Sequence, residues 1–293
     1  MTNADPQLTV IIPCYNENKS VADTVHSVLS ILERTVNSEL IVVDDGSNDG
    51  SQSILQALAK KIPQLKVIYH EENMGYGASL KTGIRRSQGE IIAITDADGT
   101  YPNERILDLV EMMVDADMVV GSRTGDHVEY SFIRKIPKFF LRHYCQWITG
   151  RKIPDMNSGL RIFRKEIALR FLHVFPNSFS FTTTITLAML CNDYMVRFEP
   201  INYSQRIGNS KIKPIRDTLR FIQLILRTGM YFAPMRAFAP IIGLLSLIFI
   251  ASASYDIITE QNLTDKTLIF LMIAINAGLF ALIADVIDKR AGR

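Results

Sequence analysis

The sequence predicts a chain of the α/β class, in which a mostly parallel sheet with helices on both faces precedes two membrane-spanning helices. Short apolar runs alternate with helix-like segments through the first 120 residues, a pattern typical of a parallel sheet. Segments 237–255 and 267–284 contain no charged residue. Each is about as long as the roughly 17 to 25 residues that cross a bilayer. A sheet domain with a carboxyl-terminal anchor is therefore expected.

The elements of the sheet domain follow from the apolar runs and from the periodic segments between them. Strands are expected at residues 8–12, 40–43, 66–69, 91–95 and 118–120. Helices are expected at residues 20–33, 52–61, 77–86 and 104–114. In such sheets, ligands bind beyond the carboxyl ends of the strands. Functional residues are therefore sought directly after each strand.

Polar side chains follow three of these strands. The candidates are Pro13, Tyr15 and Glu17 after the first strand, Asp44 and Asp45 after the second, and Asp96, Ala97 and Asp98 after the fourth. Two carboxylates one residue apart can share a divalent cation with the phosphates of a ligand. The acidic pair therefore indicates a nucleotide-diphosphate substrate. Taken alone, Asp44-Asp45-Gly46-Ser47 is more often a turn and helix cap.

Composition limits the classes of protein that remain. The chain has 293 residues, a formal net charge of +2 and a hydrophobic fraction of 47%. The near-neutral balance argues against a nucleic-acid partner. Cys14, Cys145 and Cys191 show no metal-ligand spacing, so we expect free thiols in a reducing compartment.

The two apolar segments are interpreted as a multi-pass anchor in the cytoplasmic (inner) membrane. Buried core helices are the alternative, but these seldom run so long without a polar face. Lys and Arg flank the outer ends of the pair, whereas the connector at 256–266 is mainly acidic. Basic residues concentrate on the cytoplasmic side. Both termini and the sheet domain are therefore expected in the cytoplasm.

Two further segments have one basic and one apolar face. Arg134, Lys138 and Arg142 recur every four residues within 131–147, and Arg216, Arg220 and Arg227 mark the polar side of 215–232. We expect both helices to lie at the membrane surface, although packing against the sheet is the alternative. The predicted division is a cytoplasmic catalytic domain at 1–212 that includes an interfacial helix at 131–149, a juxtamembrane helix at 213–235, and an anchor at 236–293 with spans at about 237–255 and 267–286.

The motifs also carry a family resemblance. Segments 10–17, 42–49, 73–77 and 96–98 resemble family 2 glycosyltransferases of the GT-A fold, which is Rossmann-like. Segments 119–123, 155–161 and 206–211 look more narrowly like the polyprenyl-phosphate branch, which includes dolichol-phosphate mannose synthases. The likeness covers about residues 8–232.

The resemblance implies a role for each matching residue. The donor nucleotide would contact Pro13, Tyr15, Glu17, Asp44, Asp45, Asp96, Ala97, Arg206 and Lys211. A Mg²⁺ or Mn²⁺ ion would be held by Asp96, Asp98 and Thr100, where many relatives have Gln in place of Thr100. The acceptor phosphate would meet Arg123 and Arg134, and the catalytic set would be Asp98, Asp155 and Arg123.

The role of Asp155 stays open between a general base and an orienting group. A phosphate monoester has a second pKa near ~6, so an acceptor phosphate is largely dianionic at neutral pH and needs no base. Asp155 is therefore expected to bind sugar hydroxyls or to orient Arg123. The hydroxyl-rich segment 178–184 is either part of a sugar or acceptor pocket or a helix cap with two core phenylalanines.

The resulting hypothesis is an inverting hexosyltransferase that moves one sugar from a nucleotide diphosphate to undecaprenyl or dolichyl phosphate at the cytoplasmic membrane face. A UDP-sugar is weakly preferred over GDP-mannose. The alternatives are another lipid acceptor and a non-catalytic membrane assembly module. A homo-oligomer is also expected, because Ala253, Ala274 and Gly278 would permit close helix contact.

Overall fold

The computed structural model of the protein describes residues 8–35, 37–124, 142–204, 223 and 225–291. Its strands are β1 (Leu8–Cys14), β2 (Ser38–Asp44), β3 (Leu65–Tyr69), β4 (Ile91–Ile94), β5 (Met118–Ser122), β6 (Arg161–Arg164) and β7 (Val196–Pro200). Its helices are α1 (Val21–Leu32), α2 (Ser51–Lys61), α3 (Tyr76–Arg86), α4 (Ile106–Glu111), α6 (Lys165–Phe171), α7 (Phe181–Cys191), α9 (Pro234–Glu260) and α10 (Asp265–Ala291).

The strands form one sheet in the order β3-β2-β1-β4-β6-β5-β7. All pairs are parallel except those of β6, which runs antiparallel to both β4 and β5. The five strands expected from the sequence are confirmed within a few residues. β6 and β7 were not predicted from the sequence. The sheet is therefore mostly parallel, as expected, and the reversed strand β6 begins where its two neighbours end.

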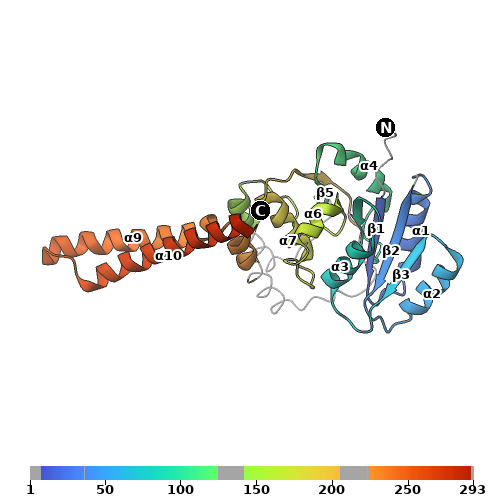
Figure 1. The fold of residues 1–293 in the computed structure, drawn as a ribbon, viewed down its shortest axis with the longest axis horizontal. Coiled ribbons are helices and arrows are strands. Elements are labelled where there is room, and N and C mark those ends of the chain that lie inside the picture. The colour runs from blue at the N-terminus through green and yellow to red at the C-terminus, as the bar shows by residue number, and fades with distance from the viewer. Residues whose placement is uncertain (1–7, 36, 125–141, 205–222, 224, 292–293) are drawn as a thin grey trace.

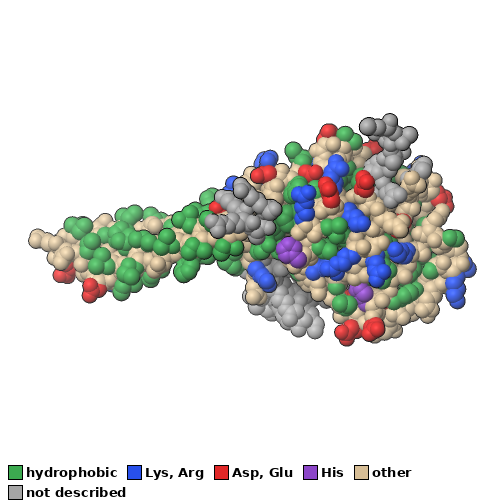
Figure 2. Space-filling view, viewed as in Figure 1, with side chains coloured by type: hydrophobic (Ala, Val, Ile, Leu, Met, Phe, Trp, Pro, Cys, Tyr) green, Lys and Arg blue, Asp and Glu red, His purple; other side chains and the backbone are tan. Residues whose placement is uncertain are grey.

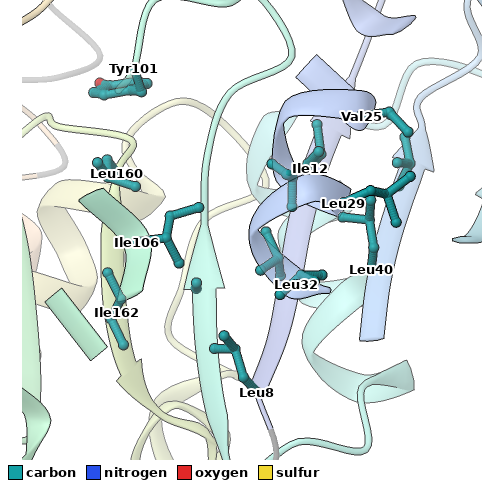
Figure 3. Packing of buried hydrophobic residues seen from close by; sticks show 14 of the residues in the cluster. Leu8, Ile12, Val25, Leu29, Leu32, Leu40, Tyr101, Ile106, Leu160 and Ile162 are labelled. Carbon is teal, nitrogen blue, oxygen red and sulfur yellow. The ribbon is translucent and has the colours of Figure 1, made fainter. Parts of the chain in front are cut away.

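Each face of the sheet is covered by its own helices and its own core (Figure 1). One core joins α1, α2 and α4 to the sheet. Figure 3 shows part of it, with Val25, Leu29 and Leu32 of α1 lying against Ile12 and Leu40. The other core packs α3, α6 and α7 against the opposite face, through Leu80, Ile167, Phe181 and similar side chains. Burial on both faces explains why the central strands β1 and β4 and the neighbouring β5 carry nearly continuous apolar runs, whereas the edge strands β3 and β7 are only partly buried.

The helix predicted at 104–114 is not one continuous α-helix. It consists of a 3-10 turn at Asn103–Arg105, the short α4 at Ile106–Glu111 and a second 3-10 turn at Met112–Asp115. Ile106, Leu109 and Met113 still face the core. The spacing of three and four between them suits tight and regular turns equally, which is why apolar periodicity did not reveal the breaks.

The two carboxyl-terminal helices form a hairpin that extends away from the sheet domain (Figure 1). Both are long and apolar enough to cross a membrane, and only 6% and 17% of the residues in their most apolar windows are buried. Apolar side chains are spread along the visible face of the hairpin, and acidic side chains lie near its far end (Figure 2). The alternative of buried core helices is therefore wrong, because most of this apolar surface faces outward.

The connector between the two helices is shorter than expected. It was predicted at 256–266, but α9 continues to Glu260 and α10 begins at Asp265. Asp256 lies within α9 and its side chain is fully buried. Its Oδ2 accepts hydrogen bonds from the Thr264 amide at 3.0 Å and from Thr267 Oγ1 at 2.7 Å. Helix α9 can continue through Asp256 because hydrogen bonds from the residues at the start of α10 stabilise the buried carboxylate.

Part of each predicted amphipathic helix can be followed. Residues 142–149 and 225–232 are helical, whereas 131–141 and 213–222 lie outside the described part of the chain. The first of these helices clamps the start of α9, because Trp147 Nε1 donates to Arg236 O at 3.1 Å and Arg236 NH1 donates to Ile148 O at 2.7 Å. This reciprocal pair ties the sheet domain to the apolar hairpin.

Candidate active site

A pocket of about 280 Å³ opens at the carboxyl edge of the sheet. Seven of the predicted site residues line it: Pro13, Tyr15, Glu17, Asp45, Asp96, Ala97 and Asp98. The other lining residues are Cys14, Asn73, Gly75, Tyr76, Ser79 and Phe179. Residues that lie more than 80 positions apart in sequence thus converge at one edge, as the parallel topology requires.

The loop after β1 is fixed by the loop after β2. The Asn16 amide donates to Ser47 Oγ at 2.9 Å, and the Glu17 amide donates to Ser51 Oγ at 3.0 Å. Asn16 has a positive φ of 53°, which Asn tolerates better than most residues. The wall formed by Pro13 to Glu17 is therefore rigidly placed.

Asp44 and Asp45 play different parts in this arrangement. Asp45 accepts the amides of Met74 and Gly75 at 3.0 and 2.8 Å, and it pairs with His70 Nδ1 at 2.7 Å. Asp44 is fully buried and is absent from the pocket wall. Its Oδ2 accepts the Ser47 amide, but its Oδ1 finds no hydrogen-bond partner among the described residues. Asp45 thus holds the 73–75 loop, and Asp44 keeps one unused acceptor behind the pocket.

The acidic pair also lines this pocket, directly after β4, the neighbour of β1. Asp96 Oδ1 accepts a hydrogen bond from the Tyr76 hydroxyl at 2.9 Å. Burial, followed by the nearby Asp96 carboxylate, raises the pKa of Tyr76 well above its ordinary value, so the phenol stays a donor. Asp98 Oδ1 accepts the Thr100 hydroxyl at 2.6 Å. Thr100 is fully buried beneath Asp98, and the contact that the structure gives its hydroxyl is to this carboxylate.

Cys14 is the one thiol on the pocket wall of the described chain. Burial, and next the charge of Asp44, raises the pKa of this thiol to about 12. A thiol in that state is a poor nucleophile. All three cysteines are free in the structure, as expected.

Arg123 and Asp155 form a bidentate pair that lies outside the pocket wall. Asp155 accepts Arg123 Nε at 2.7 Å and NH2 at 2.9 Å, and also the amides of Arg123 and Asn157 at 3.1 and 3.0 Å. Burial alone would raise the pKa of Asp155, but the bonds and charge of Arg123 outweigh it and hold that pKa below its ordinary value. Asp155 therefore stays an anion whose oxygens are engaged by four donors.

A strap of residues 176–179 closes one side of the pocket. The carbonyl of Asn177 accepts the amides of Gly77 and Ala78 at 2.9 and 3.2 Å, so it caps the start of α3. A Cβ on Gly75, whose φ is +105°, would lie only 2.3 Å from that carbonyl. The close approach brings the ring of Phe179 onto Tyr76, with centroids 5.3 Å apart. The strap thus braces the tyrosine that binds Asp96.

The alternative of a helix cap with two core phenylalanines is wrong for segment 178–184, because the Ser180 side chain makes no capping hydrogen bond to the described residues and Phe179 is 60% exposed, whereas Phe181 is buried. Thr184 Oγ1 donates to the carbonyl of Ser180, the residue before α7, and Thr186 Oγ1 donates to the Thr182 carbonyl within α7. Thr183 reaches Asn157 Oδ1 at 2.6 Å and so links α7 to the Asp155 loop. The hydroxyl groups of these threonines thus donate to backbone carbonyls at α7 and to the Asp155 loop. Phe179 is the residue of the segment that lines the pocket.

Three predicted residues, Arg134, Arg206 and Lys211, lie outside the described residues. Conversely, no role was predicted for Tyr76 or Arg161, although both stand inside motifs that were singled out, and Phe179 belongs to segment 178–184, whose role was left open. Their roles depend on contacts between distant segments, such as that from Tyr76 to Asp96, 20 residues apart.

The geometry of the pocket defines a class of protein. An acidic pair and the loop after β1 line one pocket at the carboxyl edge of a mostly parallel sheet, which is the arrangement of nucleotide-binding α/β enzymes. The model of glycosyl transferase family 2 matches residues 9–171. The chain belongs to this family, and it is a glycosyltransferase.

Curated relatives extend the likeness into the carboxyl-terminal half. The chain is 29% identical over 259 residues to a dolichyl-phosphate beta-glucosyltransferase of Trichomonas vaginalis, with 80% of this chain and 75% of the relative covered. It is also 29% identical over 290 residues to an undecaprenyl-phosphate 4-deoxy-4-formamido-L-arabinose transferase of Pseudomonas syringae pv. syringae, with 94% and 79% covered.

Solved structures confirm the GT-A type of fold. Glucosyl-3-phosphoglycerate synthase from Mycobacterium tuberculosis, in complex with UDP, aligns with a TM-score of 0.59 at 16% identity and covers 77% of this chain and 81% of its own. The same enzyme with Mn²⁺, UDP-glucose and phosphoglyceric acid aligns with a TM-score of 0.59 at 14% identity, covering 77% and 80%. At these identities the likeness concerns the fold.

Proposed function

We propose that the protein transfers a single sugar from a nucleotide-diphosphate sugar to a polyprenyl phosphate at the cytoplasmic face of a membrane, with inversion at the anomeric carbon. The observation that carries the proposal is the acidic pocket at the sheet edge in a chain that also ends in an exposed apolar hairpin. Relatives that align with most of the chain are named as dolichyl- and undecaprenyl-phosphate sugar transferases, which supports this acceptor class.

The pocket suits the nucleotide part of the donor. Pro13 and Tyr15 offer an apolar wall for a nucleoside. Asp44 is fully buried behind that wall and does not line the pocket, so the contact with base or ribose that the resemblance implied for it is not part of the proposal. UDP is preferred because neighbours of the same fold are solved with UDP and UDP-glucose. GDP-mannose is the competing donor.

A divalent metal fits the acidic pair. In the described part of the chain, no group of three or more His, Cys, Asp or Glu could hold an ion without other ligands. Two carboxylates with diphosphate oxygens and water would complete an oxygen shell of the kind that Mg²⁺ and Mn²⁺ accept. Asp96 and Asp98 would hold the ion, with Thr100 supporting Asp98. When bound, the ion would neutralise charge that develops on the departing diphosphate.

The transfer itself needs alignment more than proton transfer. An oxygen of the dianionic acceptor phosphate attacks the anomeric carbon, the bond from that carbon to the diphosphate breaks, and the nucleotide diphosphate leaves. Arg123 is suited to the acceptor phosphate because a guanidinium presents a planar fork of donors. Asp155 orients that fork, since its oxygens are already engaged by Arg123 and Asn157.

The acceptor would reach this site from the membrane. The clamp between Trp147 and Arg236 places the sheet domain against the start of the hairpin, so a lipid phosphate at the headgroup level would lie near the domain. Arg134, Arg206 and Lys211 are proposed to contact the acceptor and donor phosphates. A cytoplasmic sheet domain and self-association through the hairpin remain part of the proposal.

The test is a transfer assay with purified full-length protein in lipid vesicles. UDP- and GDP-sugars are supplied with undecaprenyl or dolichyl phosphate and with Mg²⁺, Mn²⁺ or EDTA. A chloroform-soluble, mild-acid-labile product that Asp96→Asn and Asp98→Asn abolish is expected. Transfer only to diacylglycerol or to a lipid-linked oligosaccharide would refute the acceptor, and transfer from no donor would favour an assembly module.

A further inference from the structure

Arg161 occupies a distinctive place at the site edge of the sheet. It is the first residue of β6, paired with Ile94 of β4 and with Val120 of β5. Because β6 runs antiparallel to both neighbours, its beginning lies where they end. Ile94 is two residues before Asp96, and Val120 is three residues before Arg123. Arg161 therefore stands on the strand between β4, which precedes the acidic pair, and β5, which precedes Arg123.

The side chain of Arg161 is fully buried and bound by neutral groups. Its Nε donates to the Ser158 carbonyl at 3.1 Å, and NH1 donates to the Thr182 carbonyl at 2.8 Å and to Thr186 Oγ1 at 3.1 Å. NH2 also donates to the Ser158 carbonyl. None of these hydrogen-bond partners is a carboxylate. Burial lowers the pKa of Arg161 to about 10, so the group is still a cation at neutral pH.

A buried cation bound only by neutral groups is costly for a fold. The hydrogen bonds satisfy the donors, and the nearby carboxylate of Asp155, which is already paired with Arg123, offsets the charge only in part. A buried cation of this kind is expected beside a site where an anionic ligand binds and is released. A neutral side chain would otherwise serve the same packing at lower cost.

The pocket next to Arg161 lacks positive charge on its wall. Its lining includes the carboxylates of Glu17, Asp45, Asp96 and Asp98 and no Lys or Arg of the described chain. Ser158, which Arg161 holds, precedes Gly159, and a Cβ on Gly159 would lie 2.7 Å from Asp96 Oδ2. The charge of Arg161 also acts on Tyr76, the donor to Asp96, by opposing the rise in its pKa. Arg161 thus lies directly behind the acidic wall.

We propose that Arg161 is a positioning residue whose buried charge favours the diphosphate of the donor through the pocket wall, without touching it. This inference rests on the proposed function, since it takes a nucleotide diphosphate as the ligand. Its electrostatic effect must grow with the charge of the ligand. A purely structural role would weaken uridine, UMP and UDP by the same factor, because packing does not depend on phosphate charge.

The experiment measures dissociation constants of uridine, UMP and UDP on full-length protein with saturating Mg²⁺, by calorimetry and ligand-observed NMR. A unit charge acting over ~10 Å at an effective dielectric of ~20 alters binding by roughly tenfold. Arg161→Met is therefore expected to weaken UDP about tenfold or more relative to uridine, with UMP in between. Arg161→Lys keeps the charge and should keep the ratio within about twofold, even if its melting temperature falls.

Thr186→Val is the matched control, because it removes one hydrogen bond of the guanidinium and leaves the charge in place. Equal losses for all three ligands in Arg161→Met would overturn the proposal. If Arg161→Met does not fold, Arg161→Gln, which removes the charge but keeps hydrogen-bond donors, takes its place: a UDP-to-uridine ratio reduced about tenfold supports the proposal, and an unchanged ratio overturns it. Wild-type protein that binds neither UDP nor GDP would instead refute the proposed function.

Discussion

The bidentate pair of Arg123 and Asp155 gives the sharpest prediction. Asp155→Asn keeps the shape of the side chain but replaces one oxygen with an amide that donates. Each carboxylate oxygen of Asp155 now accepts two N–H groups. Whichever oxygen is replaced, two hydrogen bonds are lost and donors face each other. The Arg123 guanidinium then keeps only one of its two hydrogen bonds to the side chain at position 155.

The magnitude follows from the burial of the pair. The side chains of Arg123 and Asp155 are only 17% and 12% exposed, so solvent does not replace the lost bonds. Hydrogen bonds to charged groups contribute about 1.5 to 3 kcal/mol each, and the loss of two, partly relieved by relaxation, is about 3 kcal/mol. For a domain of this size that lowers the melting temperature by about 6 to 12 °C. Turnover should fall about 10- to 100-fold, because Arg123 is misplaced by a fraction of an ångström.

The assay compares melting temperature and kcat of Asp155→Asn with those of Asp108→Asn. Asp108 also binds an arginine, Arg105 Nε at 2.8 Å, but its side chain is 58% exposed, so a loss of less than about 1 kcal/mol is expected. If Asp155→Asn lost all turnover with an unchanged melting temperature, Asp155 would be a general base and the reasoning here would be refuted.

The same pair also predicts a pH dependence. The folded-state pKa of Asp155 is depressed, so its stabilising effect is present above the unfolded value of about 3.9 and is lost as pH falls through the folded pKa. The difference in melting temperature between wild type and Asp155→Asn should therefore be constant above pH ~5 and narrow below pH ~4. A difference that grew on acidification would contradict the assigned charge.

Two further variants test the support of Asp96. Tyr76→Phe removes the hydroxyl that donates to Asp96 at 2.9 Å and should weaken Mn²⁺ binding and lower kcat about tenfold, measured by calorimetry and transfer, whereas Tyr194→Phe, which loses an exposed bond to an arginine, should change neither. Gly159→Ala places a Cβ 2.7 Å from Asp96 Oδ2 and should displace that carboxylate and reduce turnover more than Gly243→Ala, whose Cβ would meet nothing within 4 Å. If Tyr76→Phe and Tyr194→Phe had equal effects, the support of Asp96 by Tyr76 would be refuted. If Gly159→Ala and Gly243→Ala had equal effects, the dependence of Asp96 on the small size of Gly159 would be refuted.

Local patterns were sufficient for the predictions that succeeded. The apolar runs that became β1, β2, β4 and β5 are largely buried on both faces, so their composition alone marks them as strands of a covered sheet, whereas β3 at the sheet edge is only partly buried. The strand ends then bring Asp96, Asp98 and Pro13 together without any further information, because parallel strands share an edge.

Predictions failed where a contact between distant segments decides the conformation. β6 has only four residues and lies between β4 and β5, so it is stabilised by its neighbours rather than by its own pattern. Asp256 ended the predicted span at 255 because it is charged, yet bonds from Thr264 and Thr267 keep it within α9. Local propensity carries no trace of either partner.

The sequence by itself determined the class of the fold, the apolar hairpin and the set of carboxylates at the sheet edge, because periodicity and strand order are local properties. Only the tertiary structure decided what each charge does. It joined Asp155 to Arg123, placed Tyr76 on Asp96 and buried Arg161 behind the acidic wall. Burial and pairing fix the protonation state and strength of a charged group, and both depend on residues that the chain brings together only when folded.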